Sequence, residues 1–188
     1  MEGRFRRVVP VQQILRTIGV RQRTLLPCDS TESGALFSKD RLYRYKLWRR
    51  WSDGPTLCWL MLNPSSADEI SNDPTVERCE RRTRQMGYGR IVVLNIYAYR
   101  ATDPAELWKV ADPVGPMNDG TILIQANLAG RVVCAWGNNS EPERAAAVVA
   151  MLRAKLKIEL FHLGLTGAGQ PKHPLYVPYS IKPTPWAP

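Results

Sequence analysis

The stretch TLCWLMLNPSSADEISNDPTVERCERRTRQM, residues 56–86, decides the fold class, because different structural signals follow one another within it. Residues 56–62 are an apolar run with the length of a buried strand. Residues 75–86 are rich in helix formers and lie between a helix start signal, Asp73-Pro74, and Gly87. The stretch therefore predicts a strand, a dense polar loop and a helix, in that order.

The same order of strand and helix repeats along the rest of the chain. Further strand candidates are 90–97, 131–136 and 157–163, and further helix candidates are 104–110, 117–128 and 142–155. Strands that alternate with helices form a largely parallel sheet, with helices on both faces and right-handed crossovers. The sequence therefore predicts an α/β protein, a three-layer α/β/α sandwich around a mainly parallel four-stranded central sheet.

The segments on either side of this repeat have weaker patterns. Residues 42–51 alternate crudely in polarity and predict a half-exposed, antiparallel strand. Residues 1–34 predict a short helix at 11–18 followed by a loop, and the proline-rich residues 172–188 predict an extended arm laid on the surface. A chain of 188 residues is long enough for one domain with a substantial core, so we expect a single domain over residues 1–188.

The composition excludes disordered and membrane-spanning classes of protein. Apolar residues make up 44% of the chain and charged residues 23%, and no apolar run approaches the ~20 residues of a membrane span. The basic N-terminal segment MEGRFRRVVPVQQIL lacks the continuous apolar core and small-residue cleavage site of a secretory signal. We expect a cytoplasmic location, no membrane partner and a monomer.

The net charge of the chain favours a polyanionic partner. Lys and Arg number 26 against 17 Asp and Glu, which gives a net charge of +9. Because proteins that neutralise phosphates release counterions, nucleic acid is a better candidate partner than a membrane surface. Charge alone is weak evidence, since many basic proteins are merely soluble.

The cysteines do not predict a metal centre or cofactor. Cys28, Cys58, Cys79 and Cys134 are widely spread, without the close spacing of a zinc or iron–sulfur site. We expect reduced thiols packed in the protein interior.

The loop after the first predicted buried strand carries the densest set of candidate ligand-binding side chains. Ligands of open parallel sheets lie beyond the carboxyl ends of the strands, where this loop begins. Asn63 and Asp68 are candidates to position a ligand or a water, and Ser65 can bind a base or cap backbone amides. Asp73 before Pro74 predicts a helix N-cap, although it is also an acid within reach of a ligand. Ordinary turn chemistry accounts for the same residue types.

The second loop offers side chains suited to a nucleobase. Asn95 closes an apolar run, and its carboxamide has both the donor and the acceptor needed to bind a base edge; the alternative is an amide that satisfies neighbouring backbone groups. Tyr97 is a candidate to stack on a base, or a core residue. Arg100 is a candidate phosphate contact, or a solvated side chain.

The late loop GLTGAGQPKHPLY contains the histidine that best fits a functional role. Glycines that allow close backbone approach precede His173, and a proline that stiffens the loop follows it. Lys172, beside it, is a candidate DNA contact. His162 lies inside an apolar strand and is expected to be a satisfied core residue.

The helix at 75–86 is strongly basic on part of its surface. Its arginines are Arg78, Arg81, Arg82 and Arg84. Arg78 and Arg82 are the candidates for contacts to DNA phosphates, and a simple solvated face is the alternative.

The segments MLNPSSADEISNDPTVERC, NIYAYRATDP, AWG and LGLTGAGQPKHPLYVPY resemble a family of bacterial and phage proteins catalogued as a domain of unknown function, over roughly residues 35–180. The order of these motifs also resembles, more distantly, the uracil-DNA glycosylase superfamily. There, a Gly-x-Asn-Pro loop places a water and binds the base, a second strand ends in a base-reading Asn, a third ends near a Gly, and a late His-Pro loop enters the DNA minor groove. The matching positions here are Asn63, Asn95, Gly137 and His173.

The resemblance implies a uracil-DNA glycosylase-like fold and a metal-independent, monofunctional DNA glycosylase that flips and excises a base and leaves an abasic site. Met61 replaces the first glycine of Gly-x-Asn-Pro, and Leu175-Tyr176 follow His-Pro where a serine is usual. These departures alter the base pocket, so the expected substrate is a modified base, such as the glucosylated hydroxymethylcytosine of phage DNA, in anti-phage defence. In this scheme Asn63 or Asp68 positions the water and His173 donates to the departing base.

Two other classes of function remain open from the sequence. The first is a non-catalytic reader of modified or damaged DNA, which uses the same pocket without cleaving a bond. The second is a metal-dependent nucleotide hydrolase, in which Asp68, Glu69 and Asp73 hold magnesium.

Overall fold

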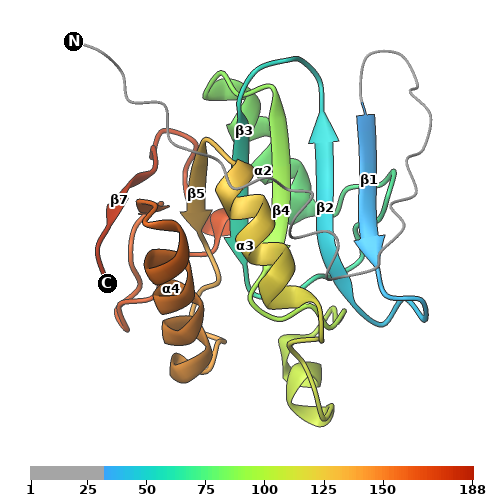
Figure 1. Ribbon diagram of the computed structural model, residues 1–188. Coiled ribbons are helices and arrows are strands. Elements are labelled where there is room, and N and C mark those ends of the chain that lie inside the picture. The colour runs from blue at the N-terminus through green and yellow to red at the C-terminus, as the bar shows by residue number, and fades with distance from the viewer. Residues whose placement is uncertain (1–31) are drawn as a thin grey trace.

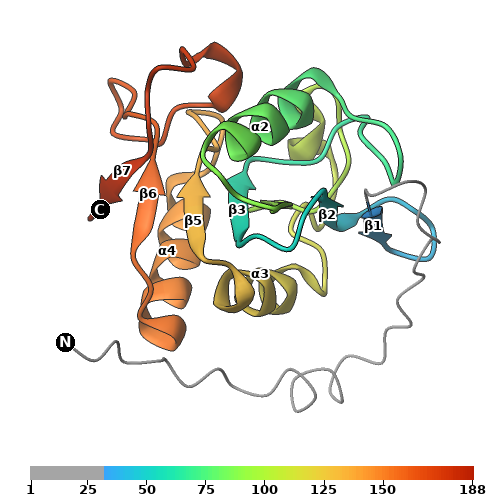
Figure 2. The ribbon, with the colours of Figure 1, turned by 90° about the horizontal axis from the view of Figure 1, so that it is seen from above.

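The computed structural model describes residues 32–188, which form one seven-stranded sheet with helices on both faces (Figures 1 and 2). The strand order is β1-β2-β4-β3-β5-β6-β7. The strands are β1 (Glu32–Phe37), β2 (Arg44–Arg50), β3 (Thr56–Met61), β4 (Arg90–Asn95), β5 (Arg131–Cys134), β6 (Leu160–His162) and β7 (Thr184–Trp186). The helices are α2 (Pro74–Gln85), α3 (Asn118–Leu128) and α4 (Pro142–Leu156), with short 3-10 turns η1 (Pro104–Lys109) and η2 (Pro174–Tyr176). The predicted helix at 11–18 lies outside the described residues.

The α/β class and the layered arrangement are confirmed, but the sheet is larger than predicted. The four predicted buried strands are neighbours, and β3 pairs in parallel with β4 and β5, as β5 does with β6. The predicted half-exposed strand is β2, which is antiparallel to β4. β1 and β7 extend the sheet at its two edges, each antiparallel to its neighbour. The sheet is therefore mixed, and the prediction of a four-stranded sheet was wrong.

The two missed strands have unusual sequences for strands. β1 contains Gly34, which lies against the indole of Trp48 so closely that a Cβ would come 2.3 Å from a ring carbon. β7 contains Pro185, which an edge strand tolerates because one side of it needs no hydrogen bond. The proline-rich arm is thus partly a strand, and its Trp186 is buried edge-to-face against Trp136, with ring centroids 5.4 Å apart.

The core is divided by the sheet into two layers. α2 covers one face, where its Cys79 packs in a cluster with Trp59 and Val93, while α3 and α4 cover the other over Leu60 and Leu94 (Figure 2). Cys58, Cys79 and Cys134 are buried free thiols, as expected; Cys28 lies outside the described residues. Within residues 32–188 no helix is long and apolar enough to cross a membrane.

The order of the parallel strands fixes where a ligand site belongs. β3 comes first in the chain, β4 lies on one side of it and β5 on the other. The connection that leads from β3 to β4 and the connection that leads to β5 therefore run to opposite sides of β3. The loops that follow β3 and β5 consequently diverge. Such a switch point, at the carboxyl ends of the strands, is where open α/β sheets bind ligands.

Candidate functional site

A cleft of about 690 Å³ opens at the carboxyl ends of the parallel strands. This volume falls within the usual range for small-molecule and cofactor sites. Each of the four strand-end loops contributes to it. The polar and small side chains of its wall include Asn63, Ser65 and Asp73 after β3, Thr102 after β4, Asn138 and Asn139 after β5, and Thr166, Lys172 and His173 after β6.

Asn63 joins two of these loops. Its Nδ2 donates to the carbonyl oxygen of Ala101, at 2.7 Å, and to that of Pro64, at 3.1 Å. These bonds fix the side chain in the wall of the cleft and leave Oδ1 as its acceptor for a ligand. Asn63 and Ser65 therefore occupy the place that the sequence predicted for them.

Asp73, and not Asp68, is the acid of the first loop that lines the cleft. The Oδ1 atom of Asp68 accepts from the backbone amides of Ile70, at 3.0 Å, and Ser71, at 2.7 Å, and these bonds hold the pKa of its carboxyl below the usual value. Asp68 thus shapes its own loop, and its predicted position at a catalytic water is wrong. Asp73 caps α2, as predicted, through Oδ1 and the amide of Val76 at 2.8 Å.

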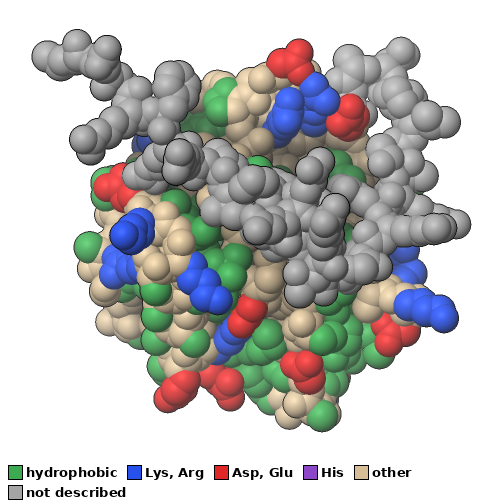
Figure 3. Space-filling view, viewed as in Figure 1, with side chains coloured by type: hydrophobic (Ala, Val, Ile, Leu, Met, Phe, Trp, Pro, Cys, Tyr) green, Lys and Arg blue, Asp and Glu red, His purple; other side chains and the backbone are tan. Residues whose placement is uncertain are grey.

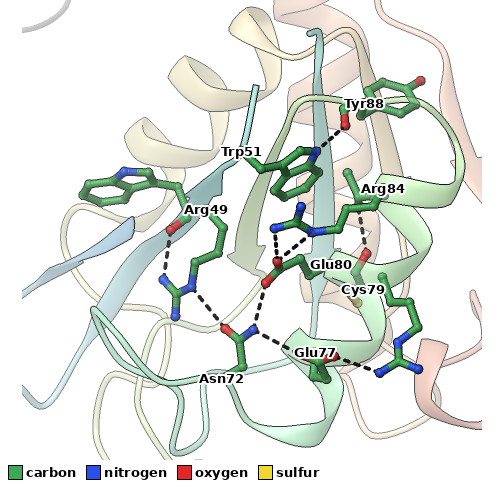
Figure 4. A network of polar contacts seen from close by, with 11 residues as sticks. Arg49, Trp51, Asn72, Glu77, Cys79, Glu80, Arg84 and Tyr88 are labelled. Atoms are coloured by element: carbon green, nitrogen blue, oxygen red, sulfur yellow. Dashed lines mark hydrogen bonds and ion pairs between the residues drawn. The ribbon is translucent and has the colours of Figure 1, made fainter. Parts of the chain in front are cut away.

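An arginine of β2 holds this long loop against the sheet (Figure 4). Arg49 is only 4% exposed and donates to the backbone carbonyls of Asp68 and Ser71 and to Oδ1 of Asn72. Asn72 in turn donates to Glu80 of α2, at 2.8 Å. The network fixes residues 68–72 of the loop against β2 and α2, so that the adjoining Asp73 is presented to the cleft from a fixed position.

His173 is held at the cleft as a neutral imidazole. Its Nδ1 accepts from the backbone amide of Leu175 at 3.4 Å, which places the ring proton of the neutral form on Nε2. Burial lowers the pKa of His173, against the opposing effect of the Asp73 charge. Nε2–H is therefore a donor available to a ligand at neutral pH.

We expect His173 to make stability depend on pH. Because its folded pKa is lowered from 6.5, the unfolded chain binds more protons between the two pKa values, and stability falls as pH drops through that window. The loss ends below the folded pKa. Urea unfolding at about pH 7.5 and about pH 5.5 should show a larger loss for the wild type than for His173→Asn. Equal losses would mean that His173 is not held neutral by its surroundings.

Asn95 and Tyr97 do not reach the cleft, so their predicted contacts with a base are wrong for this conformation. Both are 1% exposed. Asn95 is enclosed at the end of β4, beside Asn118, whose Nδ2 donates to the Asn95 backbone carbonyl at 3.0 Å. The hydroxyl of Tyr97 accepts from the amide of Glu141 at 3.2 Å, and its ring packs edge-on against Trp108. Tyr97 thus positions the loop after β5.

Most of the predicted DNA-binding arginines are used inside the protein. Arg78 donates to the carbonyls of Pro174, at 3.0 Å, and Val177, at 2.7 Å, and so holds the loop that carries His173. Arg82, 3% exposed, donates to carbonyls of the same C-terminal segment. Arg100 donates to the backbone of Arg41. Arg78 and Arg82 are thus engaged by the protein's own backbone and not free for phosphates, so their prediction is corrected, whereas the phosphate contact of Arg100 stays a prediction. Lys172 lies exposed at the cleft.

Several cleft residues were missed by the sequence analysis, and two of them, Arg44 and Tyr176, bear on its chemistry. Arg44 is 2% exposed and lines the cleft from β2, a strand that the sequence placed at the margin of the fold. Tyr176 lines it from the late loop and is 82% exposed. The position of Tyr176 three residues after His173 was a usable signal, whereas nothing in the alternating pattern of 42–51 marked Arg44.

The comparisons with known proteins give a family but no activity. A family described as "Protein of unknown function (DUF1643)" matches residues 44–175, which include every residue that lines the cleft except Tyr176 and Val177. A search of curated proteins finds no match.

Proposed function

The chain belongs to the DUF1643 family of proteins of unknown function, and we propose that it is a cytoplasmic, monofunctional DNA glycosylase that excises a modified base. The observation that carries this proposal is the meeting of Asn63, Asp73 and a neutral His173 in one cleft. A carboxylate, an amide and an uncharged N–H donor are the groups that hydrolysis of an N-glycosidic bond needs.

The resemblance to the uracil-DNA glycosylase superfamily supports the same proposal. The places of its water-binding loop, its third-strand glycine and its late His-Pro loop correspond to Asn63, Gly137 and His173, and all of these line the cleft. The place of the base-reading Asn corresponds to Asn95, which is buried. We therefore propose a uracil-DNA glycosylase-like fold with a differently built base pocket, in which Ser65 and Asn63 contact the base.

The proposed reaction uses His173 at the base and Asp73 at the water. The target nucleotide is extruded from the DNA, and the bond between C1′ and the base nitrogen breaks, with its electron pair leaving on the base. Nε2–H of His173 donates to the base as negative charge develops there. Asp73 holds a water on the opposite face of the sugar and accepts its proton as the water oxygen bonds to C1′. The base leaves as an anion hydrogen-bonded to Nε2–H of His173 and takes a proton from solvent, Asp73 returns its proton to solvent, and an abasic site remains.

The rim of the cleft suits an extruded nucleotide. Lys172 is exposed there and can contact a phosphate of the displaced strand. Tyr176 presents its ring to solvent 6.0 Å from the ring centroid of His173, where it can stack on a base. The face formed by α3 and α4 instead carries charges of both signs among apolar side chains (Figure 3). We therefore expect DNA to bind on the cleft side.

The test uses purified protein in EDTA with DNAs that contain ordinary, uracil-containing and phage-hypermodified bases, including glucosylated hydroxymethylcytosine. Abasic sites are scored by nicking with an abasic-site endonuclease, and released base by mass spectrometry. We expect nicking and free base from a modified DNA. Tight binding of one DNA without released base would favour a non-catalytic reader, and turnover only with added magnesium would favour a metal-dependent nucleotide hydrolase; either result would overturn the glycosylase.

A further inference from the structure

Arg44 is a buried cation whose donors the protein leaves partly unused. It is the first residue of β2, is 2% exposed, and lines the cleft. Its Nη1 donates to the carbonyl of Ala67 at 2.8 Å, while its Nε is buried without a hydrogen-bond partner among the described residues. None of the ion pairs found in residues 32–188 includes Arg44.

Burying the Arg44 guanidinium in this way is unfavourable unless another group supplies the missing hydrogen bonds and a counter-charge. Removing a guanidinium from water is costly when hydrogen bonds and a counter-charge do not replace the lost hydration. Burial lowers the pKa of Arg44 to about 10, against the opposing effect of the Asp73 charge, so the group still carries its charge at neutral pH. A charged, forked donor that lines a cleft and lacks an ion-pair partner is suited to an anionic oxygen group.

Arg49, on the same strand, shows that the fold can satisfy a buried arginine. Arg49 is 4% exposed, and its Nε and both of its terminal nitrogens donate to oxygen atoms of neighbouring residues. It does not line the cleft. The Nε atoms of Arg82, Arg90 and Arg100 are also buried without a hydrogen-bond partner among the described residues, but none of these arginines lines the cleft. An unpaired buried donor and a place in the cleft wall coincide at Arg44.

We propose that Arg44 forms an anion subsite in the floor of the cleft, which binds a negatively charged oxygen group on the ligand's base. The assignment of this anionic group to a base rests on the proposed function. Arg44 is buried, whereas DNA phosphates remain at the surface, where Lys172 is available. Thr75 and Val76 at the start of α2 also line the cleft, and the positive end of that helix adds to the attraction. The substrate class is thus a base with an acidic or oxygen-rich substituent.

Binding of unreactive small molecules tests the subsite separately from catalysis. The probes are orotate, a pyrimidine that carries a carboxylate, inorganic phosphate, and neutral uracil, each at constant ionic strength. We expect orotate to raise the melting temperature of the wild type saturably, by about 3 °C at several times its Kd, and uracil to raise it far less. A rise with phosphate but none with orotate would keep the anion subsite and overturn its assignment to the base. No rise with either anion would overturn the subsite.

Matched variants separate the subsite from general attraction to a basic protein. Arg44→Met should melt, without ligand, at least as high as the wild type and lose the rise with orotate, while Arg49→Met should melt lower and keep that rise. If Arg44→Met does not fold, Arg44→Lys keeps a cation without the fork, and its Kd for orotate should be about tenfold weaker. Unchanged affinity in the Arg44 variant that folds would overturn the proposal. Anion binding without base release would instead contradict only the glycosylase.

Discussion

Asp73→Asn is expected to slow base release by about 100- to 1,000-fold, because it removes the carboxylate proposed to accept the proton of the attacking water. The variant should keep its stability. Asn is as good an N-cap as Asp, so the bond from the Val76 amide to the side chain that begins α2 is retained. The measurement is single-turnover release of base by the wild type and by the variant, together with their melting temperatures.

Asp68→Asn is the matched control for this prediction. Asp68 belongs to the same loop, but its carboxylate is occupied by the backbone amides of Ile70 and Ser71 and does not line the cleft. Its replacement should leave the rate of base release within about threefold of the wild type, the size of effect expected from a small loss of loop order. The reverse result, with Asp68 essential and Asp73 dispensable, would restore the position predicted from sequence and contradict the proposed mechanism.

The choice between these two acids shows where sequence patterns stop being informative. The apolar run at 56–62, the Asp73-Pro74 start and the glycine after the helix are local signals, and β3 and α2 follow them closely. Which acid faces the cleft depends on how Arg49 holds the loop, and that contact comes from a strand earlier in the chain. Local patterns do not encode such a contact.

Asn95, at the end of the neighbouring strand β4, illustrates the same limit. Its position at the end of an apolar run was correctly recognised as the end of a strand. The burial of its side chain, however, depends on how the chain packs around the end of β4, where Asn118 of α3 also donates to the Asn95 backbone carbonyl. His173, Ser65 and Asn63 were placed correctly because the loops at the carboxyl ends of parallel strands converge whatever their detailed conformation.

The net charge of the chain overstates how many positive charges the protein exposes at its surface. Besides Arg44 and Arg49, Arg82 is almost fully buried, and Arg144 donates to the carbonyl of Ile96 and pairs with Asp119. These arginines join strand ends, loops and the C-terminal segment by hydrogen bonds to backbone carbonyls. Part of the positive charge thus serves contacts inside the protein, and the proposed binding of DNA would depend on fewer cations than the composition suggests.

Arg82→Ala is expected to destabilise the protein by about 3 kcal/mol, which corresponds to roughly 9 °C in melting temperature. Arg82 donates to the carbonyls of Val177, Pro178 and Ile181, and its guanidinium lies 4.9 Å from the ring centroid of Tyr179. Its removal leaves these carbonyls without their charged donor and loosens the segment that follows His173. Base release should therefore fall as well.

Arg81→Ala separates this internal role from a contact with DNA. Arg81 lies beside Arg82 on α2, but it is exposed and pairs only with Glu77, at 3.1 Å. Its loss should cost less than about 0.5 kcal/mol, as for other surface ion pairs within a helix. If Arg82 instead contacted phosphates, Arg82→Ala would keep the melting temperature and lower DNA affinity with a shallower salt dependence. Urea unfolding and salt-dependent DNA binding of the two variants distinguish these outcomes. A residue that holds two segments of the protein together changes stability in the absence of any ligand, whereas a phosphate contact does not.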